Sequence, residues 1–339
     1  KREPTTLLGR GYSFAKPSKK INIELPDSYR KGHFWCFGTT RVGKTRIMEN
    51  MVEQDIKKGY NVVVLDPKGD NDLFSKIVQV AFQTKRIEDL ILITPVYPQY
   101  SAIVDPLAYY FLPEELVGHI VSGVSVGSGD AQFFFNIAYE ISLVIVQALI
   151  LIAKHEGSSP HFNLADVKAR IDRAGLEELK LTIDSIGDEE AFQLSKEIDQ
   201  IIQSPMDYYS KVTSSLRTAL TELTSGNIGK IIGKAHENRF IHRLEDGEGV
   251  IVVVQLGALL TRKASYTLGK VILSMIQSFV GRIFHAQERT SIPLCIYIDE
   301  AQSVLYFGIE ELFAKAGGAG IWVHGFCQSK AQIDAVLDP

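Results

Sequence analysis

The chain has 339 residues, of which 45% are hydrophobic and 22% are charged, and its formal net charge is −4. This balance is typical of a soluble globular protein with one large or two ordinary domains, and it excludes a disordered tail, a fibre and a coiled coil. The negative net charge excludes a generally basic nucleic-acid coat, and three cysteines are too few for a disulfide framework.

Strand and helix patterns alternate along the first third of the chain. Short alternating apolar runs between Leu7 and Leu25 predict small leading strands. Apolar strand patterns then follow at residues 33–37, 62–65 and 90–93, and helical patterns lie between them at 46–58 and 73–81. Because strands that alternate with helices form βαβ units, we expect a parallel sheet, and the continuous apolar strands indicate that helices cover both faces.

The pattern changes to helical periodicity between residues 111 and 246. Residues 112–246 contain 20 acidic and 12 basic residues, so we expect an acidic, all-α inserted domain. One helical run, residues 133–153, has transmembrane length. Its polar stripe, which includes Glu140, favours a long helix buried among other helices.

Alternating strands and helices resume at Val250. Strand patterns lie at residues 250–256, 294–298 and 321–326, and helical patterns lie at 268–283 and 310–316. The sequence therefore predicts an α/β domain in two segments, residues 1–110 and 247–339, around the all-α insert at 111–246.

Residues 38–45 read GTTRVGKT and match the phosphate-loop pattern G-x-x-x-x-G-K-[ST]. The glycines let the backbone turn so that its N–H groups face phosphate oxygens at the positive end of the next helix. Lys44 is expected to reach the β- and γ-phosphates of ATP, and Thr45 is expected to ligate Mg²⁺. The alternative is a glycine-rich turn with an incidental lysine. The predicted nucleotide-binding residues are Gly38, Thr39, Thr40, Arg41, Val42, Gly43, Lys44 and Thr45.

Two acids follow the apolar strand 294–298. Asp299 is expected to hold Mg²⁺ through water, and Glu300 is expected to polarise the attacking water. Paired acids at this place favour hydrolysis over transfer to a metabolite, because the base is aimed at a water. Gln328, after the strand 321–326, is a candidate contact for the γ-phosphate or the lytic water, and an ordinary cap is the alternative.

Asp66-Pro67-Lys68-Gly69-Asp70 closes a strand that we expect next to the phosphate-loop strand. A surface turn with a proline corner is the alternative interpretation. The eight histidines are scattered, and none pairs with Cys or Asp at metal-ligand spacing, so we expect no metal site built from protein ligands alone.

In chain order, the runs HFWCFGTTRVGKT, NVVVLDPKGD, SAIVDPL, CIYIDEAQ and GFCQS resemble the conjugative coupling ATPases. These are the TraG/TraD-type coupling proteins of type IV secretion systems, and the likeness is nearest to TraD of integrative conjugative elements. The resemblance extends from Arg30 to the end of the chain. It implies a RecA-like P-loop domain that carries an inserted all-α domain, with ATP and Mg²⁺ as ligands. It also implies an N-terminal membrane anchor, which this chain is expected to lack.

The resemblance further implies a hexamer that binds ATP between subunits at the cytoplasmic face of the bacterial inner membrane. Its implied partners are single-stranded DNA, relaxase and relaxosome proteins, and the type IV secretion machinery. By motif, Lys44 and Thr45 bind nucleotide and Mg²⁺, Asp299 and Glu300 form the acidic pair, and Gln328 matches the sensor glutamine.

The sequence departs from the family pattern at residues 317–320, which read GGAG where many relatives carry an arginine. A basic residue acting on a neighbouring subunit must therefore come from elsewhere, and Arg30 is the candidate. Two other functions remain open. One is a nucleotide-switched module that recognises substrate proteins, and the other is a related secretion ATPase that moves no DNA.

Overall fold

The computed structural model describes residues 3–124, 131–232 and 238–337, and the chain forms two compact units. The first unit consists of Lys1–Ala102, Phe240–Leu260 and Ile276–Asp338, and the second of Ile103–Arg239 and Thr261–Met275. The boundaries expected from the sequence, after residue 110 and after residue 246, stay a prediction.

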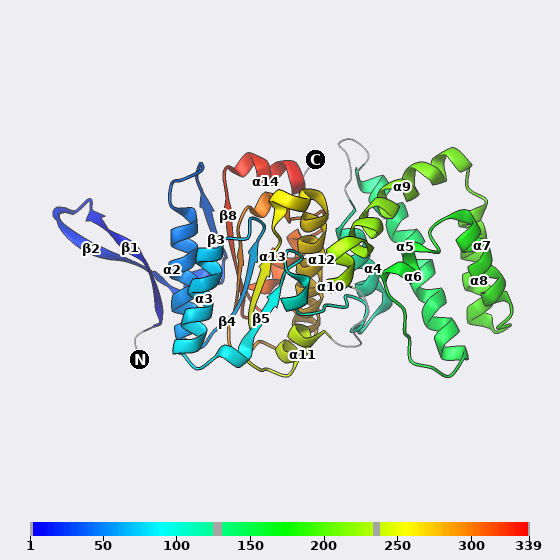
Figure 1. Cartoon of the computed structure of the whole chain (residues 1–339), viewed down its shortest axis with the longest axis horizontal. Helices are drawn as coiled ribbons and strands as arrows, with labels where there is room; N and C mark the ends of the chain where they lie inside the picture. Colours follow the sequence, from blue (N-terminus) through cyan, green and yellow to red (C-terminus); the bar gives the residue numbers. More distant parts are fainter. Residues whose placement is uncertain (1–2, 125–130, 233–237, 338–339) are drawn as a thin grey trace. The chain divides into compact units, whose positions relative to one another are not determined.

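A six-stranded parallel sheet forms the centre of the first unit, in the order β3-β8-β7-β4-β6-β5 (Figure 1). The strands are β3 (Phe34–Phe37), β4 (Asn61–Asp66), β5 (Leu90–Ile93), β6 (Ile251–Gln255), β7 (Leu294–Ile298) and β8 (Ile321–Cys327). Every residue of β4, β6, β7 and β8 is buried, as expected for strands covered on both faces. The predicted α/β class with a parallel sheet is confirmed.

Helices cover the two faces of this sheet. On one face α2 (Lys44–Lys57) and α3 (Asn71–Gln83) bury Met48, Met51 and Ile77 against the apolar strands. On the other side lie α13 (Glu310–Ala316) and the last turns of α12 (Ala258–His285) (Figure 1). Three shorter helices are α1 (Asp27–Arg30), α11 (Arg239–Glu245) and α14 (Lys330–Leu337). The 3₁₀ turns of this part of the structure span Ile87–Asp89, Pro98–Tyr100 and Ala301–Ser303.

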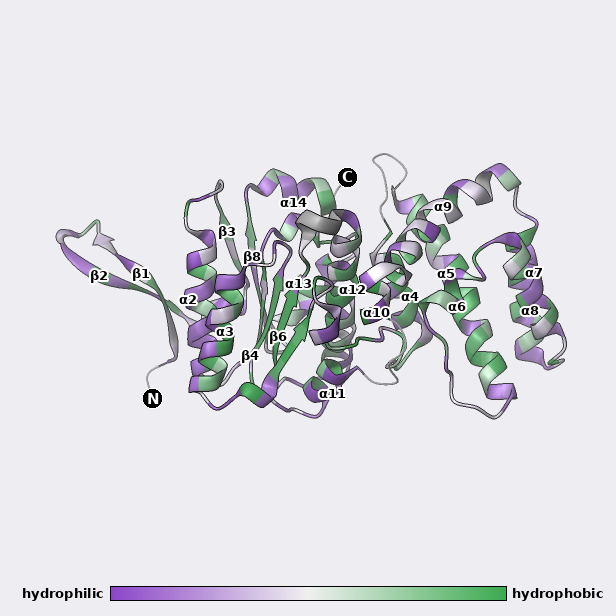
Figure 2. Ribbon diagram, viewed as in Figure 1, coloured by the Kyte–Doolittle hydropathy of each residue, from purple (hydrophilic) through white to green (hydrophobic). Residues whose placement is uncertain are grey.

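An antiparallel hairpin of β1 (Thr5–Ser13) and β2 (Lys16–Pro26) projects from the sheet domain (Figure 1). Between Leu7 and Ile23 the sequence has four basic residues and no acidic residue. Figure 2 shows hydrophilic residues along this hairpin and hydrophobic residues on the central strands. Phe14 at the hairpin's turn is fully exposed. The hairpin confirms the small leading strands predicted from the sequence.

The second unit is built from helices. They are α4 (Pro113–Ser122), α5 (Ala131–His155), α6 (Leu164–Lys168), α7 (Arg173–Asp184), α8 (Glu189–Ile202), α9 (Met206–Thr224), α10 (Gly226–Ile231) and the middle of α12. The side chains of Asn163, Asp172 and Asp188 accept hydrogen bonds from the first turns of α6, α7 and α8, which explains where these helices begin. The predicted all-α character of the insert is confirmed.

Two helices pass a length and composition test for a membrane span, Gln132–His155 and Lys263–His285. Of their most apolar windows, 44% and 61% are buried inside the protein. Core helices of soluble proteins pass the same test, so this finding is weak evidence for a membrane span.

Candidate nucleotide site

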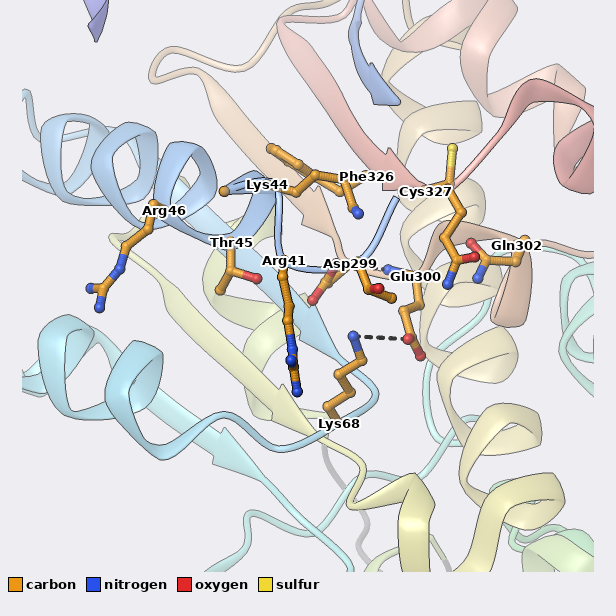
Figure 3. A pocket seen from close by; sticks show the side chains of 13 residues that line it. Arg41, Lys44, Thr45, Arg46, Lys68, Asp299, Glu300, Gln302, Phe326 and Cys327 are labelled. Carbon is orange, nitrogen blue, oxygen red and sulfur yellow. Dashed lines mark hydrogen bonds and ion pairs between the residues drawn. The ribbon is translucent and has the colours of Figure 1, made fainter. Parts of the chain in front are cut away.

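The candidate site lies where the carboxyl ends of β3, β8, β7 and β4 meet at one edge of the sheet. In parallel α/β sheets this edge is where ligands bind, because the loops that follow the strands converge there. A pocket of 360 Å³ opens at this edge. Its walls are Thr40, Arg41, Gly43, Lys44, Thr45, Arg46, Lys68, Asp299, Glu300, Gln302, Phe326, Cys327 and Gln328 (Figure 3).

The phosphate-loop segment turns sharply between β3 and α2. A Cβ on Gly38 would lie 2.8 Å from Cγ2 of Val42, so a larger residue there would require the Val42 side chain to move. Arg41 and Gly43 have φ of 63° and 99°, which is the left-handed region that lets the loop reverse. Nζ of Lys44 donates to the carbonyl oxygens of Gly38 and Thr39 at 2.5 and 2.7 Å. The lysine is thus folded back on its own loop.

Asp299 and Glu300 follow β7, in the middle of the sheet. The Asp299 backbone N–H donates to Leu65 at 3.0 Å, and the Asp299 carboxylate, 6% exposed, accepts from the Glu300 N–H at 2.9 Å. Burial raises the pKa of Asp299, against the lowering effects of that N–H and of Lys68 and Lys44. Glu300 has φ of 45°, an uncommon value for a non-glycine residue.

The loop after β4 brings Lys68 into the same pocket. The buried Asp66 carboxylate accepts the backbone N–H groups of Lys68 at 3.1 Å, of Gly69 at 3.0 Å and of Asp70. Burial raises the pKa of Asp66 to about 6, although these N–H groups act in the opposite direction. Nζ of Lys68 lies 2.9 Å from Oε1 of Glu300, and Figure 3 shows the two side chains pointing toward each other.

The oxygens of Thr45 and Asp299 are hard ligands of the kind that Mg²⁺ prefers. Within residues 3–124, 131–232 and 238–337, no group of three or more His, Cys, Asp or Glu side chains is placed to hold a metal ion. Mg²⁺ at nucleotide sites usually binds through one or two protein oxygens and the phosphates of the nucleotide.

The structure brings most of the predicted site residues together. Thr40, Arg41, Gly43, Lys44, Thr45, Asp299, Glu300 and Gln328 line the pocket. Gly38, Thr39 and Val42 belong to the same loop but are not among the lining residues. Sequence reasoning did not place Lys68, Gln302, Arg46, Phe326 or Cys327 in the site. The 66–70 motif, which contains Lys68, is visible in the sequence, but its pattern does not indicate which residue Lys68 contacts.

The expected position of the 66–70 motif next to the phosphate-loop strand is wrong. Two strands, β8 and β7, lie between β3 and β4. Strands that follow one another along the chain often pair, but a parallel sheet can accept later strands between them, and β7 and β8 come from the C-terminal segment. The motif reaches the pocket because β4 borders β7, the strand that carries the two acids.

The expected role of Arg30 in a neighbouring subunit is also wrong. Its side chain is 0% exposed, and its Nη1 and Nη2 atoms donate to both carboxylate oxygens of Asp55 at 2.8 and 2.5 Å. It also donates to Tyr297 at 3.0 Å and from Nε to Nε2 of His324 at 3.1 Å. A guanidinium enclosed in this way inside its own chain cannot reach another subunit's nucleotide.

No family model matches this chain. It is 30% identical over 88 residues to the type 4 coupling protein DotL of Legionella pneumophila, a match that covers 25% of this chain and 11% of DotL. The chain thus spans a small part of that relative.

Solved structures of the bacterial conjugative coupling protein TrwB have the same fold. The unbound TrwB fragment is 16% identical, with a TM-score of 0.65 over 97% of this chain and 68% of the fragment. TrwB with ADP and Mg²⁺ and TrwB with the ATP analogue ADPNP are each 18% identical to this chain, with TM-scores of 0.63. Both matches cover 97% of this chain, and they cover 69% and 70% of the respective TrwB chains. At these identities the likeness shows the fold. The chain therefore has the RecA-like fold of a conjugative coupling protein and, over a quarter of its length, sequence similarity to a type IV coupling protein, as its motifs predicted.

Proposed function

We propose that this chain binds ATP with Mg²⁺ in the pocket at the carboxyl edge of the sheet and hydrolyses it. The observation that carries the proposal is the convergence of a phosphate loop, an acidic pair and a glutamine on one pocket of 360 Å³. The fold supports it, because TrwB, which shares that fold, has been solved with ADP and Mg²⁺ and with an ATP analogue.

Five of the lining residues have a part in this chemistry. Lys44 leaves the carbonyl oxygens of its loop and binds the β- and γ-phosphates, while Gln328 contacts the γ-phosphate or the lytic water. Thr45 and Asp299 hold Mg²⁺, which neutralises phosphate charge when it is bound. Glu300 accepts a proton from water as the water oxygen bonds to the γ-phosphorus. The bond from that phosphorus to the bridging oxygen breaks, and ADP and phosphate leave.

In the cell we propose that the chain is the ATPase part of a type IV coupling protein. It recruits a relaxase–DNA substrate and drives single-stranded DNA into a type IV secretion channel, as a hexamer at the cytoplasmic face of the inner membrane. The similarity to DotL and the TrwB fold support the coupling role. We also propose that residues 111–246 form the inserted all-α domain and that residues 1–110 and 247–339 form the nucleotide-binding domain.

The test is the ATPase rate of the purified chain, measured against protein concentration with and without single-stranded DNA at low salt. For a DNA-driving ring, the ATPase rate per chain should rise with protein concentration. It should also rise several-fold when DNA is added. A protein-recognition switch, or a secretion ATPase that moves no DNA, should not respond to DNA. Unmeasurable ATP binding under all these conditions would refute the nucleotide site itself.

Two variants separate the acids. Glu300→Gln removes the base but keeps its size, so the variant should bind ATP with Mg²⁺ and turn over very slowly. Asp299→Asn should instead weaken the dependence of binding on Mg²⁺. Identical behaviour of the two variants would contradict the division of labour between them.

A further inference from the structure

An ion pair joins Glu300, the proposed base of the pocket, to the ammonium group of Lys68. Lys68 Nζ lies 2.9 Å from Glu300 Oε1, and both residues line the pocket beside Asp299. The Glu300 Oε1 atom that accepts from the ammonium group is less available to accept a proton from water. An ammonium group held by a carboxylate is likewise less available to bind a phosphate.

We propose that Lys68 senses the terminal phosphate of the nucleotide. Before a nucleotide binds, Lys68 holds Glu300. When a nucleoside triphosphate binds, the Lys68 ammonium moves to the γ-phosphate and leaves Glu300 free to act on water. This inference rests on the proposed ATPase function. It gives Lys68, a residue of the same chain, the task of placing a positive charge at the γ-phosphate, which buried Arg30 cannot do.

The exchange is energetically accessible because the ion pair is solvated. The side chains of Lys68 and Glu300 are 54% and 21% exposed. A partly exposed pair of this kind adds little net stability. A phosphate carries more negative charge than a carboxylate and offers more acceptor oxygens, so a γ-phosphate within reach outcompetes Glu300 for the ammonium group.

The backbone around Lys68 is fixed, so the exchange needs only a side-chain movement. Asp66 accepts the N–H groups of Lys68, Gly69 and Asp70, and the Asp66 carbonyl accepts the Leu256 N–H at 3.0 Å. The four-carbon stem of a lysine has enough rotatable bonds to move its ammonium group while its Cα stays in place.

The electrostatic surroundings keep Lys68 charged for this task. Burial lowers the pKa of Lys68, but its hydrogen bond to Glu300 and the charges of Glu300, Asp299 and Asp66 outweigh burial, so the pKa lies above its usual value. Lys44, the other ammonium group of the pocket, bonds to its loop carbonyls and not to Glu300. The two lysines of the pocket therefore have different partners.

The first experiment compares the affinity for Mg²⁺-ADPNP with the affinity for Mg²⁺-ADP by calorimetry. Lys68→Ala should weaken ADPNP binding about tenfold and leave ADP binding within about twofold, because ADP has no γ-phosphate. Lys76→Ala is the matched control. Lys76 pairs with Glu53 at the same distance of 2.9 Å but does not line the pocket, so its loss should change neither affinity.

The second experiment repeats the measurement in the Glu300→Gln background. Without the carboxylate, Lys68 no longer has to leave a partner, so Lys68→Ala should weaken ADPNP binding more than it does in the wild-type chain. Equal losses in both backgrounds, no loss in either, or the same loss for ADP would overturn the proposal while the ATPase function stands. Failure of the wild-type chain to bind either nucleotide would refute the proposed function as well.

Discussion

Breaking the Arg30–Asp55 pair should destabilise the nucleotide-binding unit far more than breaking any surface ion pair. Both side chains are 0% exposed, and the guanidinium meets the carboxylate through two hydrogen bonds. Burial raises the pKa of Asp55, but the hydrogen bond and charge of Arg30 outweigh burial and hold that pKa below its usual value. Removing one partner of a buried pair leaves the other charge uncompensated, at a cost of about 3–5 kcal/mol.

The contacts that remain to the unpaired charge determine which variant loses more of the free energy of unfolding. In Asp55→Asn the guanidinium keeps Asp27, whose Oδ1 lies 3.2 Å from Nη1, so we expect a loss of about 3 kcal/mol. In Arg30→Met the Asp55 carboxylate keeps only the Tyr297 hydroxyl, so we expect about 5 kcal/mol. The double variant Arg30→Met/Asp55→Leu removes both charges and should lose much less than the sum of the single variants.

Tryptophan fluorescence during urea unfolding measures this loss, because both tryptophans of the chain, Trp35 and Trp322, lie in this unit. The matched control is Lys57→Ala, which breaks an exposed pair with Glu53 on α2 and should cost less than about 1 kcal/mol. The reasoning is refuted if Asp55→Asn costs no more than this control.

Three further predictions concern single residues. Lys44→Ala removes the charge that faces the β- and γ-phosphates, so ATP hydrolysis should fall at least about a hundredfold in a phosphate-release assay while the far-UV spectrum stays unchanged. Burial and the charge of Arg30 lower the pKa of His324 to about 3. The stability that its neutral ring provides is therefore complete above the unfolded pKa of about 6.5, and about 2 kcal/mol of it is lost between pH 7 and pH 5. Urea unfolding should show that this pH dependence of the free energy of unfolding is absent in His324→Gln. Gly325→Ala would place a Cβ 2.2 Å from the Trp35 ring, so the urea midpoint should fall by an amount that corresponds to about 1–3 kcal/mol.

The strands and the phosphate loop could be predicted because local pattern determines them. β7 has the bounds expected from its apolar run, 294–298, and the other five strands of the sheet lie within a residue or so of theirs. Residues 38–43 form the loop between β3 and α2, and Lys44 and Thr45 begin the helix, as the phosphate-loop pattern predicts. The glycine spacing and the apolar runs are short-range features, so one sequence suffices to read them.

The order of the strands and the partners of long side chains could not be predicted. Which strand enters between β3 and β4 depends on packing between distant segments, and periodicity carries no information on it. Arg30 shows the same limit. An arginine before a strand gives no sign that Asp55, Tyr297 and His324 will enclose it, because these partners come from three other elements. The Lys68–Glu300 pair likewise joins residues that are far apart in the chain.

The projecting β1–β2 hairpin also affects how the protein can be purified. The chain's formal net charge is −4, which by itself predicts retention on an anion exchanger at pH 7. Between Leu7 and Ile23 the hairpin gathers four basic residues without an acidic one, and it projects from the sheet domain. At low salt, where charges are weakly screened, such a local basic patch attracts a negatively charged resin even though the net charge is negative. The protein should therefore adhere to both kinds of exchanger, and removing residues 8–23 should abolish its retention on the cation exchanger.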